Sequence, residues 1–141
     1  MIFPDANLLI YAYDQRSPFH PAAKLWLEHL FRQESRIAFS WATIQAFLRI
    51  MTNPRLHGAG QRQVVIRAID DWLSHPAASI IEPGRHHWSV LASLIDVAGA
   101  FGPMITDAHL AALAIEYDAT FCTHDRDFQR FPGLKLQYPL S

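Results

Sequence analysis

Three aspartates stand where the chain passes from an apolar stretch to a more polar one. Asp5 directly follows the apolar residues 1–4, and Asp125 follows the apolar stretch "ATFCTH". Asp107 follows Thr106 at the expected start of a helix, where the helix dipole and free N–H groups favour an anion. In parallel sheets, ligands bind beyond the carboxyl ends of the strands, so these positions predict three carboxylates at one edge of one sheet.

Carboxylates gathered in this way repel one another and raise one another's pKa, and a bound divalent cation offsets that repulsion. Oxygen donors without a paired Cys or His motif favour Mg²⁺, or Mn²⁺, over Zn²⁺. Such ions can hold and polarise a phosphodiester and activate water for its hydrolysis. We therefore predict Asp5, Asp107 and Asp125 as metal ligands and catalytic residues, with Asp127 as a fourth candidate. Asn7 is expected to hydrogen-bond a ligand or a bound water. The alternative for any one aspartate alone is a turn former or helix cap.

Short apolar stretches alternate with longer helical patterns, which predicts an α/β fold with a parallel sheet covered on both faces. The expected strands lie at residues 1–4, 36–40, 78–84, 119–124 and 134–138. The expected helices lie at residues 6–13, 17–33, 41–56, 60–76, 85–102 and 107–117. Ser17 with Pro18 is the expected start of the second helix, and Thr106 is the expected cap of the last.

Length and composition indicate an ordinary globular protein. The 141 residues suit one domain, 1–141, and half of them are hydrophobic. A net charge of −1 gives no global attraction to nucleic acid, and the single cysteine, Cys122, excludes a disulfide within the chain. No apolar run approaches the roughly 20 residues that span a bilayer, and the first residues lack the basic region of a signal peptide. We therefore expect a cytoplasmic protein without a membrane partner.

Four segments carry a resemblance that covers nearly the whole chain. They are "FPDANLLIYA" (3–12), "FSWATIQAFLRIMTNPR" (39–55), "ITDAHLAALAIEYDATFCTHDRDF" (105–128) and "FPGLKLQYPL" (131–140). The third is the most specific, because an aspartate opens an Ala/Leu helix that leads into a small apolar strand and Thr-x-Asp-x-Asp-Phe. In combination these segments resemble the PIN-domain ribonucleases that act as toxins of VapBC toxin–antitoxin pairs.

The resemblance implies an α/β/α sandwich around a central parallel sheet of four to five strands. It also implies Mg²⁺-dependent cleavage of an RNA substrate, and an antitoxin protein that blocks the site. Motif by motif, the acids of the family fall on Asp5, Asp107 and Asp125. We further expect a homodimer, with the apolar helical stretches 25–31 and 64–73 offering a dimer surface or an antitoxin groove.

One position departs from the family pattern. The family carries a glutamate in a pattern like Ser-x-x-Thr-x-x-Glu, and here that pattern reads Ser40, Thr43 and Ala46. Alanine cannot bind a metal, and Gln45 lies about 100° round the helix from that position. The alternative hypothesis is therefore a degenerate PIN fold that binds RNA or a protein partner without cleaving it.

Two other acidic-pocket classes fit less well. A phospho-acceptor receiver needs an acidic pair near the first strand, and a haloacid-dehalogenase-like phosphatase needs Asp-x-Asp there, whereas this chain has Asp5-Ala6-Asn7. Among the remaining residues, Arg49, Arg130 and His124 are candidates for contact with RNA. His109 is expected on an exposed helix face, and the four tryptophans are expected in the core or at an interface.

Overall fold

A five-stranded parallel sheet forms the centre of the protein. The computed structural model describes residues 1–34, 36–57 and 61–140. The strand order is β3-β2-β1-β4-β5, and every neighbouring pair is parallel. The strands are β1 (Ile2–Pro4), β2 (Ile37–Phe39), β3 (Ala78–Ile80), β4 (Thr120–Cys122) and β5 (Lys135–Gln137). All five expected strands are therefore present, and each is only three residues long.

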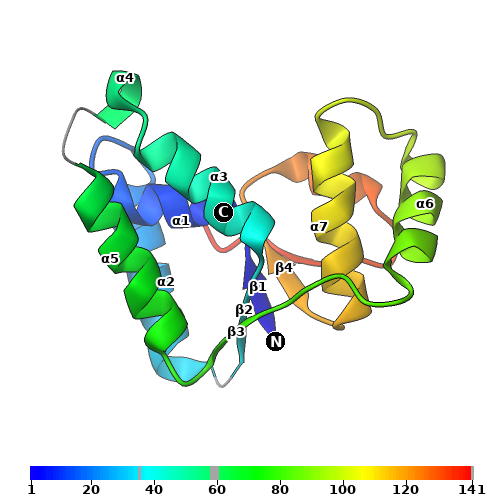
Figure 1. The fold of residues 1–141 in the computed structure, drawn as a ribbon, viewed down its shortest axis with the longest axis horizontal. Coiled ribbons are helices and arrows are strands. Elements are labelled where there is room, and N and C mark those ends of the chain that lie inside the picture. The colour runs from blue at the N-terminus through cyan, green and yellow to red at the C-terminus, as the bar shows by residue number, and fades with distance from the viewer. Residues whose placement is uncertain (35, 58–60, 141) are drawn as a thin grey trace.

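Helices cover both faces of this sheet, which confirms the expected α/β/α arrangement. They are α1 (Ala6–Tyr13), α2 (His20–Gln33), α3 (Trp41–Met51), α4 (Pro54–His57), α5 (Gln61–Ser74), α6 (His87–Ala98), α7 (Met104–Glu116) and the 3₁₀ helix η1 (Arg126–Arg130). In Figure 1, α6 and α7 lie together on one side of the strands, and α1, α2, α3 and α5 lie on the other. Residue 60, the expected first residue of the helix at 60–76, and residue 141 lie outside the described residues.

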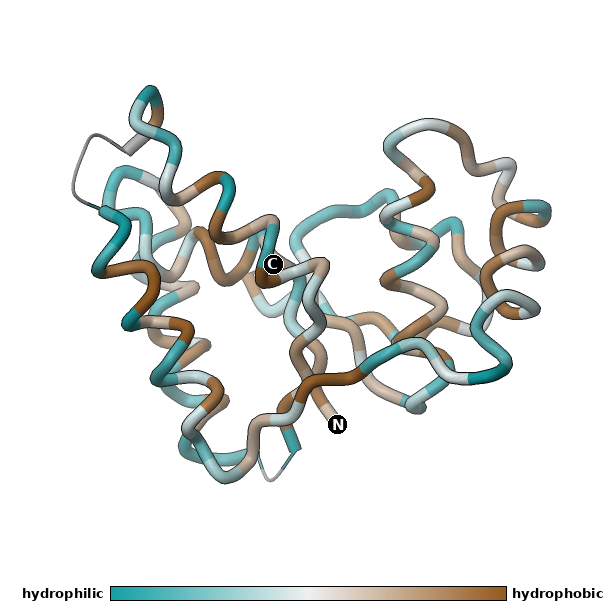
Figure 2. Tube along the Cα trace, viewed as in Figure 1, coloured by the Kyte–Doolittle hydropathy of each residue, from teal (hydrophilic) through white to brown (hydrophobic). Residues whose placement is uncertain are grey.

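Two apolar cores separate these layers. Within β2, Ile37 and Phe39 pack into the core beneath α1, α2, α3 and α5, whereas Ala38 packs into the core beneath α6 and α7. This alternation follows from the two-residue period of a strand, and it requires nearly continuous apolar sequence because both faces are covered. Helix α5, which covers the sheet, is two-sided instead, and Figure 2 shows hydrophobic and hydrophilic residues alternating along it.

The register of the central strands brings two distant loops side by side. Pro4 at the end of β1 is paired with Cys122 at the end of β4. The backbone N–H of Asp5 then donates to the carbonyl oxygen of Cys122 at 2.8 Å. Since parallel strands end at the same edge of a sheet, the residues that follow β1 and β4 are neighbours although they are more than a hundred positions apart in sequence.

Two expected helix starts are wrong. The last helix begins at Met104, with Pro103 at the N-cap position, so Thr106 lies inside its first turn and caps nothing. Proline is favoured at the beginning of a helix because it lacks an N–H that would be unpaired there in any case. The second helix begins at His20 instead of Pro18, and Ser17 Oγ accepts a hydrogen bond from the N–H of Phe19 in the preceding turn.

The tryptophans divide between the core and the surface. Trp72 is fully buried and stacks on Phe39, with ring centroids 5.4 Å apart. Trp41 and Trp88 expose 50% and 71% of their surface, so of the two places expected for them, the core or an interface, only the core is excluded. Among the described residues, no helix combines the length and the hydropathy that a membrane span requires.

Candidate active site

Asp5 is a buried carboxylate held by two hydrogen bonds. It caps α1, and its Oδ1 accepts from the N–H of Ala6 at 2.7 Å. Its Oδ2 accepts from the hydroxyl of Thr123, also at 2.7 Å. Only 8% of the residue is exposed. Burial raises the pKa of Asp5 to about 6 despite these two hydrogen bonds, and the charges of Asp107 and Asp125 add to the increase.

Thr123 connects this aspartate to the rest of the edge. Its hydroxyl donates to Asp5, and the same oxygen accepts from the side-chain amide of Asn7 at 3.2 Å and from the N–H of Asp125 at 3.0 Å. The residue has no exposed surface. Sequence reasoning quoted this threonine within the Thr-x-Asp motif but gave it no role, since its main partner lies 118 positions away. Asn7 therefore reaches Asp5, one of the predicted ligands, through Thr123 and does not bond it directly.

Asp125 caps a helix, and with Asp5, Asp107 and Asp127 it forms the group of carboxylates called here the acidic edge. It is the N-cap of η1, where its Oδ1 accepts from the N–H of Asp127 at 2.9 Å. Its backbone is fixed by the bond from its own N–H to Thr123. Asp125 is therefore a helix cap, as the alternative for a single aspartate predicts, and it also lies near Asp5.

Asp107 reaches the same group of charges from a helix. It lies in the first turn of α7 and is partly buried. The pKa of Asp107 is raised to about 6, first by burial and then by the carboxylates of Asp125 and Asp127, while Arg130 lowers it. Within the described part of the chain, the Asp107 carboxylate makes no hydrogen bond. The charges of Asp107 and Asp125 raise the pKa of Asp5, and the charge of Asp125 raises the pKa of Asp107, so the three carboxylates lie near one another, as their positions in the sequence predict.

The donor set suits a hard cation that keeps part of its water shell. Among the described residues, no three or more His, Cys, Asp or Glu side chains form a compact group that could enclose a metal ion alone. Mg²⁺ is usually bound through one or two carboxylates with several waters, so it does not require such a group. Asn7 Oδ1 is buried and has no hydrogen-bond partner in the described structure, which leaves a neutral oxygen beside the carboxylates. These oxygens fit Mg²⁺ or Mn²⁺ and do not form the closed site of a structural zinc ion.

Comparison with known proteins identifies the family. The model of the PIN domain family matches residues 2–134. The chain belongs to the PIN domain family. Ribonuclease VapC37 of Mycobacterium tuberculosis is 35% identical over 136 residues, which cover 96% of this chain and 94% of that protein. Ribonuclease VapC33 from the same species is 36% identical over 141 residues, with 99% of both chains covered.

Solved structures share the fold at lower identity. VapBC-1 from nontypeable Haemophilus influenzae matches with a TM-score of 0.71 and 21% identity, and the match covers 100% of both chains. VapBC2 from Rickettsia felis, bound to a promoter DNA fragment, matches with a TM-score of 0.70 and 22% identity over 97% of this chain and 98% of that one. The Mycobacterium tuberculosis toxin VapC20, described as cleaving the sarcin–ricin loop, matches with a TM-score of 0.68 and 14% identity over 96% of this chain and 99% of its own.

The Ser-x-x-Thr part of the PIN domain pattern has a structural role here. Ser40 caps α3, and its hydroxyl accepts from the N–H of Thr43 at 3.2 Å. The hydroxyl of Thr43 in turn accepts from the N–H of Ser40 at 3.3 Å, which completes a capping box. Ala46 follows one turn later and is partly buried, so its methyl group supplies no ligand at that position.

Other predicted contact residues fall into two groups. Arg130 lies by the acidic edge, where its guanidinium is 3.5 Å from an oxygen of Asp127. Arg49 is exposed on the last turn of α3. His124 is packed against the rings of Phe19 and Tyr11, with centroids 4.4 and 5.9 Å away, and its Nδ1 is buried without a partner in the described residues.

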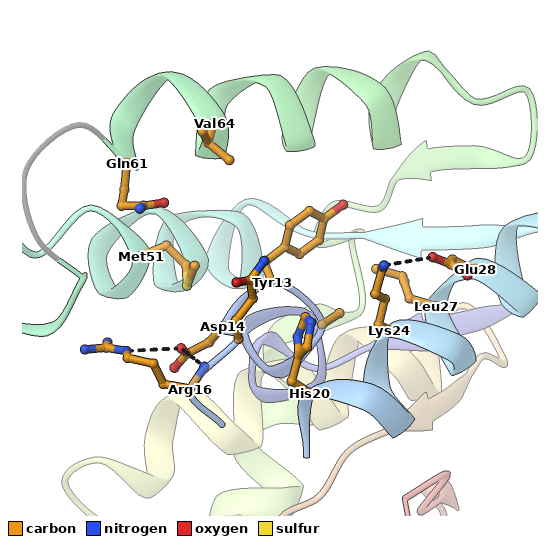
Figure 3. Close-up of a pocket in the computed structure, with 12 residues that line it drawn as sticks. Tyr13, Asp14, Arg16, His20, Lys24, Leu27, Glu28, Met51, Gln61 and Val64 are labelled. Carbon is orange, nitrogen blue, oxygen red and sulfur yellow. Dashed lines mark hydrogen bonds and ion pairs between the residues drawn. The ribbon is translucent and has the colours of Figure 1, made fainter. Parts of the chain in front are cut away.

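A hollow among the described residues lies apart from the four aspartates. It measures about 550 Å³ and is bounded by α1, α2, α3 and α5, and Figure 3 shows Leu27, Met51 and Val64 among the residues that surround it. A second hollow of about 390 Å³, lined by Phe31 and Trp72 among others, lies between α2 and α5. These are the two helices whose apolar stretches predict a protein-binding surface.

Proposed function

We propose that this PIN domain is a Mg²⁺-dependent endoribonuclease, with Mn²⁺ as a substitute, and that it is the toxin of a toxin–antitoxin pair. The observation that carries the proposal is the nearness of Asp5, Asp107 and Asp125 at one edge of the sheet, where the charges of Asp107 and Asp125 help to raise the pKa of Asp5. Full-length relatives named as ribonucleases support an RNA substrate. The same names give no support to the alternative of a PIN fold that binds without cleaving.

In this proposal, Asp5, Asp107 and Asp125 hold the metal ion, which polarises the phosphodiester and lowers the pKa of water when it is bound. Thr123 orients Asp5 by donating to Oδ2, which leaves the other oxygen bonded to the N–H of Ala6. Asn7 supplies a neutral carbonyl oxygen at the same edge. Arg130 adds a positive charge near Asp107 and Asp127 that suits a phosphate group.

Removal of one carboxylate tests the proposal. We expect Asp5→Asn or Asp107→Asn to reduce Mg²⁺-dependent RNA cleavage by about 100-fold or more, because each loses a charged ligand. Cleavage is measured on a mixed RNA substrate with the toxin freed of antitoxin, in Mg²⁺, in Mn²⁺ and in a chelator.

Asp118→Asn is the matched control. It makes the same chemical change at an exposed position with a positive φ of 52°, which asparagine tolerates. This variant should cleave RNA like the wild type. RNA that stays intact with the wild type in both metals, or that is cut equally in the chelator, would contradict the proposal.

The antitoxin is proposed to bind the helical side of the molecule that contains the two hollows. Apolar side chains from α2 and α5 line them, and Leu25 and Val64 on these helices are 66% and 52% exposed. The structural relatives include a toxin–antitoxin complex from Klebsiella pneumoniae, which supports a partner of this kind. We also propose a homodimer, for which the exposed Trp41 and Trp88 are candidate contacts, and action in the cytoplasm, where RNA is found.

A further inference from the structure

A chain of partly buried polar side chains joins α6 to α7, away from the aspartates. His87 Nδ1 lies 2.5 Å from Glu116 Oε2, and His87 Nε2 lies 3.0 Å from His109 Nδ1. The side chains of His87 and Glu116 are only 12% and 10% exposed. The sequence predicts an exposed face for His109, whereas the structure places its ring edge-on to that of His87, with centroids 4.9 Å apart.

The same chain of contacts holds the segment that leads from β3 into α6. Glu116 Oε1 accepts from the N–H of Gly84 at 3.0 Å, and a Cβ at this glycine would stand only 3.3 Å from that oxygen. The hydroxyl of Tyr117 donates to the carbonyl oxygen of Glu82 at 2.8 Å. The C-terminal end of α7 is therefore bonded to the entry of α6, in addition to their shared apolar core.

This connection bears on Asp107 because Asp107 depends on its helix. His109 lies two residues further along α7, about 200° round the helix axis from Asp107. One side of the first turns of α7 thus meets His87, and the opposite side presents Asp107 to Asp125 and Asp127. Since the Asp107 carboxylate makes no hydrogen bond in the described structure, the placement of α7 determines its position.

Hydrogen bonds fix such a placement more specifically than apolar contacts do. Leu94 and the alanines of α7 share an apolar core, whose contacts are not directional, whereas a hydrogen bond requires defined atoms at a defined distance. A buried polar group without its partner costs about 1–3 kcal/mol, so rotations of α7 that break the chain are disfavoured. Both ends of His87 are engaged, which ties α7 at His109 and at Glu116 through one side chain.

We propose that His87 is a positioning residue for the acidic edge, which bridges Glu116 and His109 and so fixes the rotation of α7 that presents Asp107. The inference rests on the proposed function in so far as Asp107 is taken as a metal ligand. It assigns no proton transfer and no substrate contact to His87.

Mn²⁺ binding to the metal-free protein, measured by electron paramagnetic resonance, is the main test. His87→Phe keeps a ring but removes both contacts, and it should weaken Mn²⁺ binding and lower kcat by about tenfold each, as loss of an outer-shell partner does. The KM for RNA should stay within about twofold, because no substrate contact is lost. Amide exchange in the first turns of α7 should become faster.

Two further variants make the result decisive. His87→Gln offers a donor and an acceptor on one side chain and should restore Mn²⁺ binding to within about threefold of wild type. His86→Phe makes the same substitution at the exposed neighbour, which makes no capping hydrogen bond, and it should leave Mn²⁺ binding unchanged.

Several results would overturn the inference. Wild-type Mn²⁺ binding by a folded His87→Phe variant would do so, and so would equal losses in the Phe and Gln variants. If His87→Phe fails to fold, Glu116→Gln and His87→Gln decide, since the first should weaken Mn²⁺ binding more than the second. A wild type that binds Mn²⁺ without cutting RNA contradicts the ribonuclease proposal alone, whereas a wild type that binds no Mn²⁺ contradicts both.

Discussion

The carboxylates of the acidic edge are held in two different ways. Asp5 and Asp125 follow neighbouring strands and are joined through one buried hydroxyl, that of Thr123. Asp107 stands on α7, makes no hydrogen bond in the described residues, and owes its place to the packing of a whole helix. The first arrangement fixes side chains by local bonds, and the second fixes one side chain by the orientation of an element.

This difference separates a rigid part of the edge from an adjustable one. A slight rotation of α7 would move Asp107 without breaking any bond of its own, so only the contacts of the helix, including those of His87, oppose it, whereas Asp5 cannot move without losing Thr123 or Ala6. Because the groups of a functional site must be held within about 0.5 Å of their productive positions, the two kinds of support should respond differently to substitution. The following predictions test the contrast, beginning with the largest expected effect.

Loss of the Thr123 hydroxyl should loosen Asp5 and Asp125, the two carboxylates that follow strands. Thr123→Val keeps the shape but leaves Asp5 Oδ2 and the amide of Asn7 without their partner, so we expect about 100-fold lower RNA cleavage. The free energy of unfolding should fall by about 1–3 kcal/mol, measured by chemical denaturation. Thr106→Val, an exposed threonine on α7, is the control and should change neither value. Equal effects of the two variants would show that the hydroxyl at position 123 does not organise the edge.

A new carboxylate on α3 would add a ligand from a third place in the fold, beside the strand ends that supply Asp5 and Asp125 and the helix that supplies Asp107. We expect Ala46→Glu to tighten Mn²⁺ binding by about threefold to tenfold, because it restores the acid of the family pattern. Gln45→Glu adds the same charge about 100° round the helix and should have little effect. Equal Mn²⁺ affinities of wild type and Ala46→Glu would mean that this position does not reach the ion.

The pH dependence of stability should distinguish Asp107, whose pKa is raised, from the exposed Asp118. Because the pKa of Asp107 is raised from its ordinary value of 3.8 to about 6, its ionisation destabilises the metal-free fold, and this penalty grows as the pH rises from about 4 to about 6 and is complete above that. Asp107→Asn should therefore raise the melting temperature by about 2–4 °C at pH 7.5, by about half as much at pH 5 and hardly at all at pH 3.5, after allowance for its partial exposure.

Asp118→Asn again provides the control for this measurement. Lys135 lowers the pKa of Asp118, so both folded and unfolded states are ionised above pH 5 and no gain should appear at pH 7.5. Scanning calorimetry in a chelator gives these values. A gain from Asp107→Asn that is the same at pH 5 and pH 7.5 would count against the ionisation of Asp107 as its cause.

Much of this architecture could be predicted from local sequence. The helix at residues 6–13 has the expected bounds, since Asp5 caps it and apolar residues fill it. The strands follow from short apolar runs, and the position of Asp5 and Asp125 after two of them follows from the edge rule for parallel sheets. The predicted start of α7 was wrong because the helix begins after Pro103, three residues before the expected cap Thr106.

The rest depends on contacts that leave no local pattern. His87 meets Glu116 and His109 across 29 and 22 positions, and nothing near any of the three residues indicates the others. The exposure of Trp88 was also hidden, because α6 is apolar on most of its circumference and its buried side cannot be read from periodicity. Whether the three aspartates bind a cation remains a prediction.

The pairing of β1 with β4 has a consequence for the newly made chain. β1 can pair with β2 soon after both are made, but β4 follows β1 by more than a hundred residues, so one side of β1 stays unpaired until β4 is made. A fragment that stops before Thr120 contains Asp5 and Asp107 but lacks the hydroxyl that holds Asp5 and the strand that precedes Asp125. The chemistry proposed for this protein therefore requires that β4 has been made.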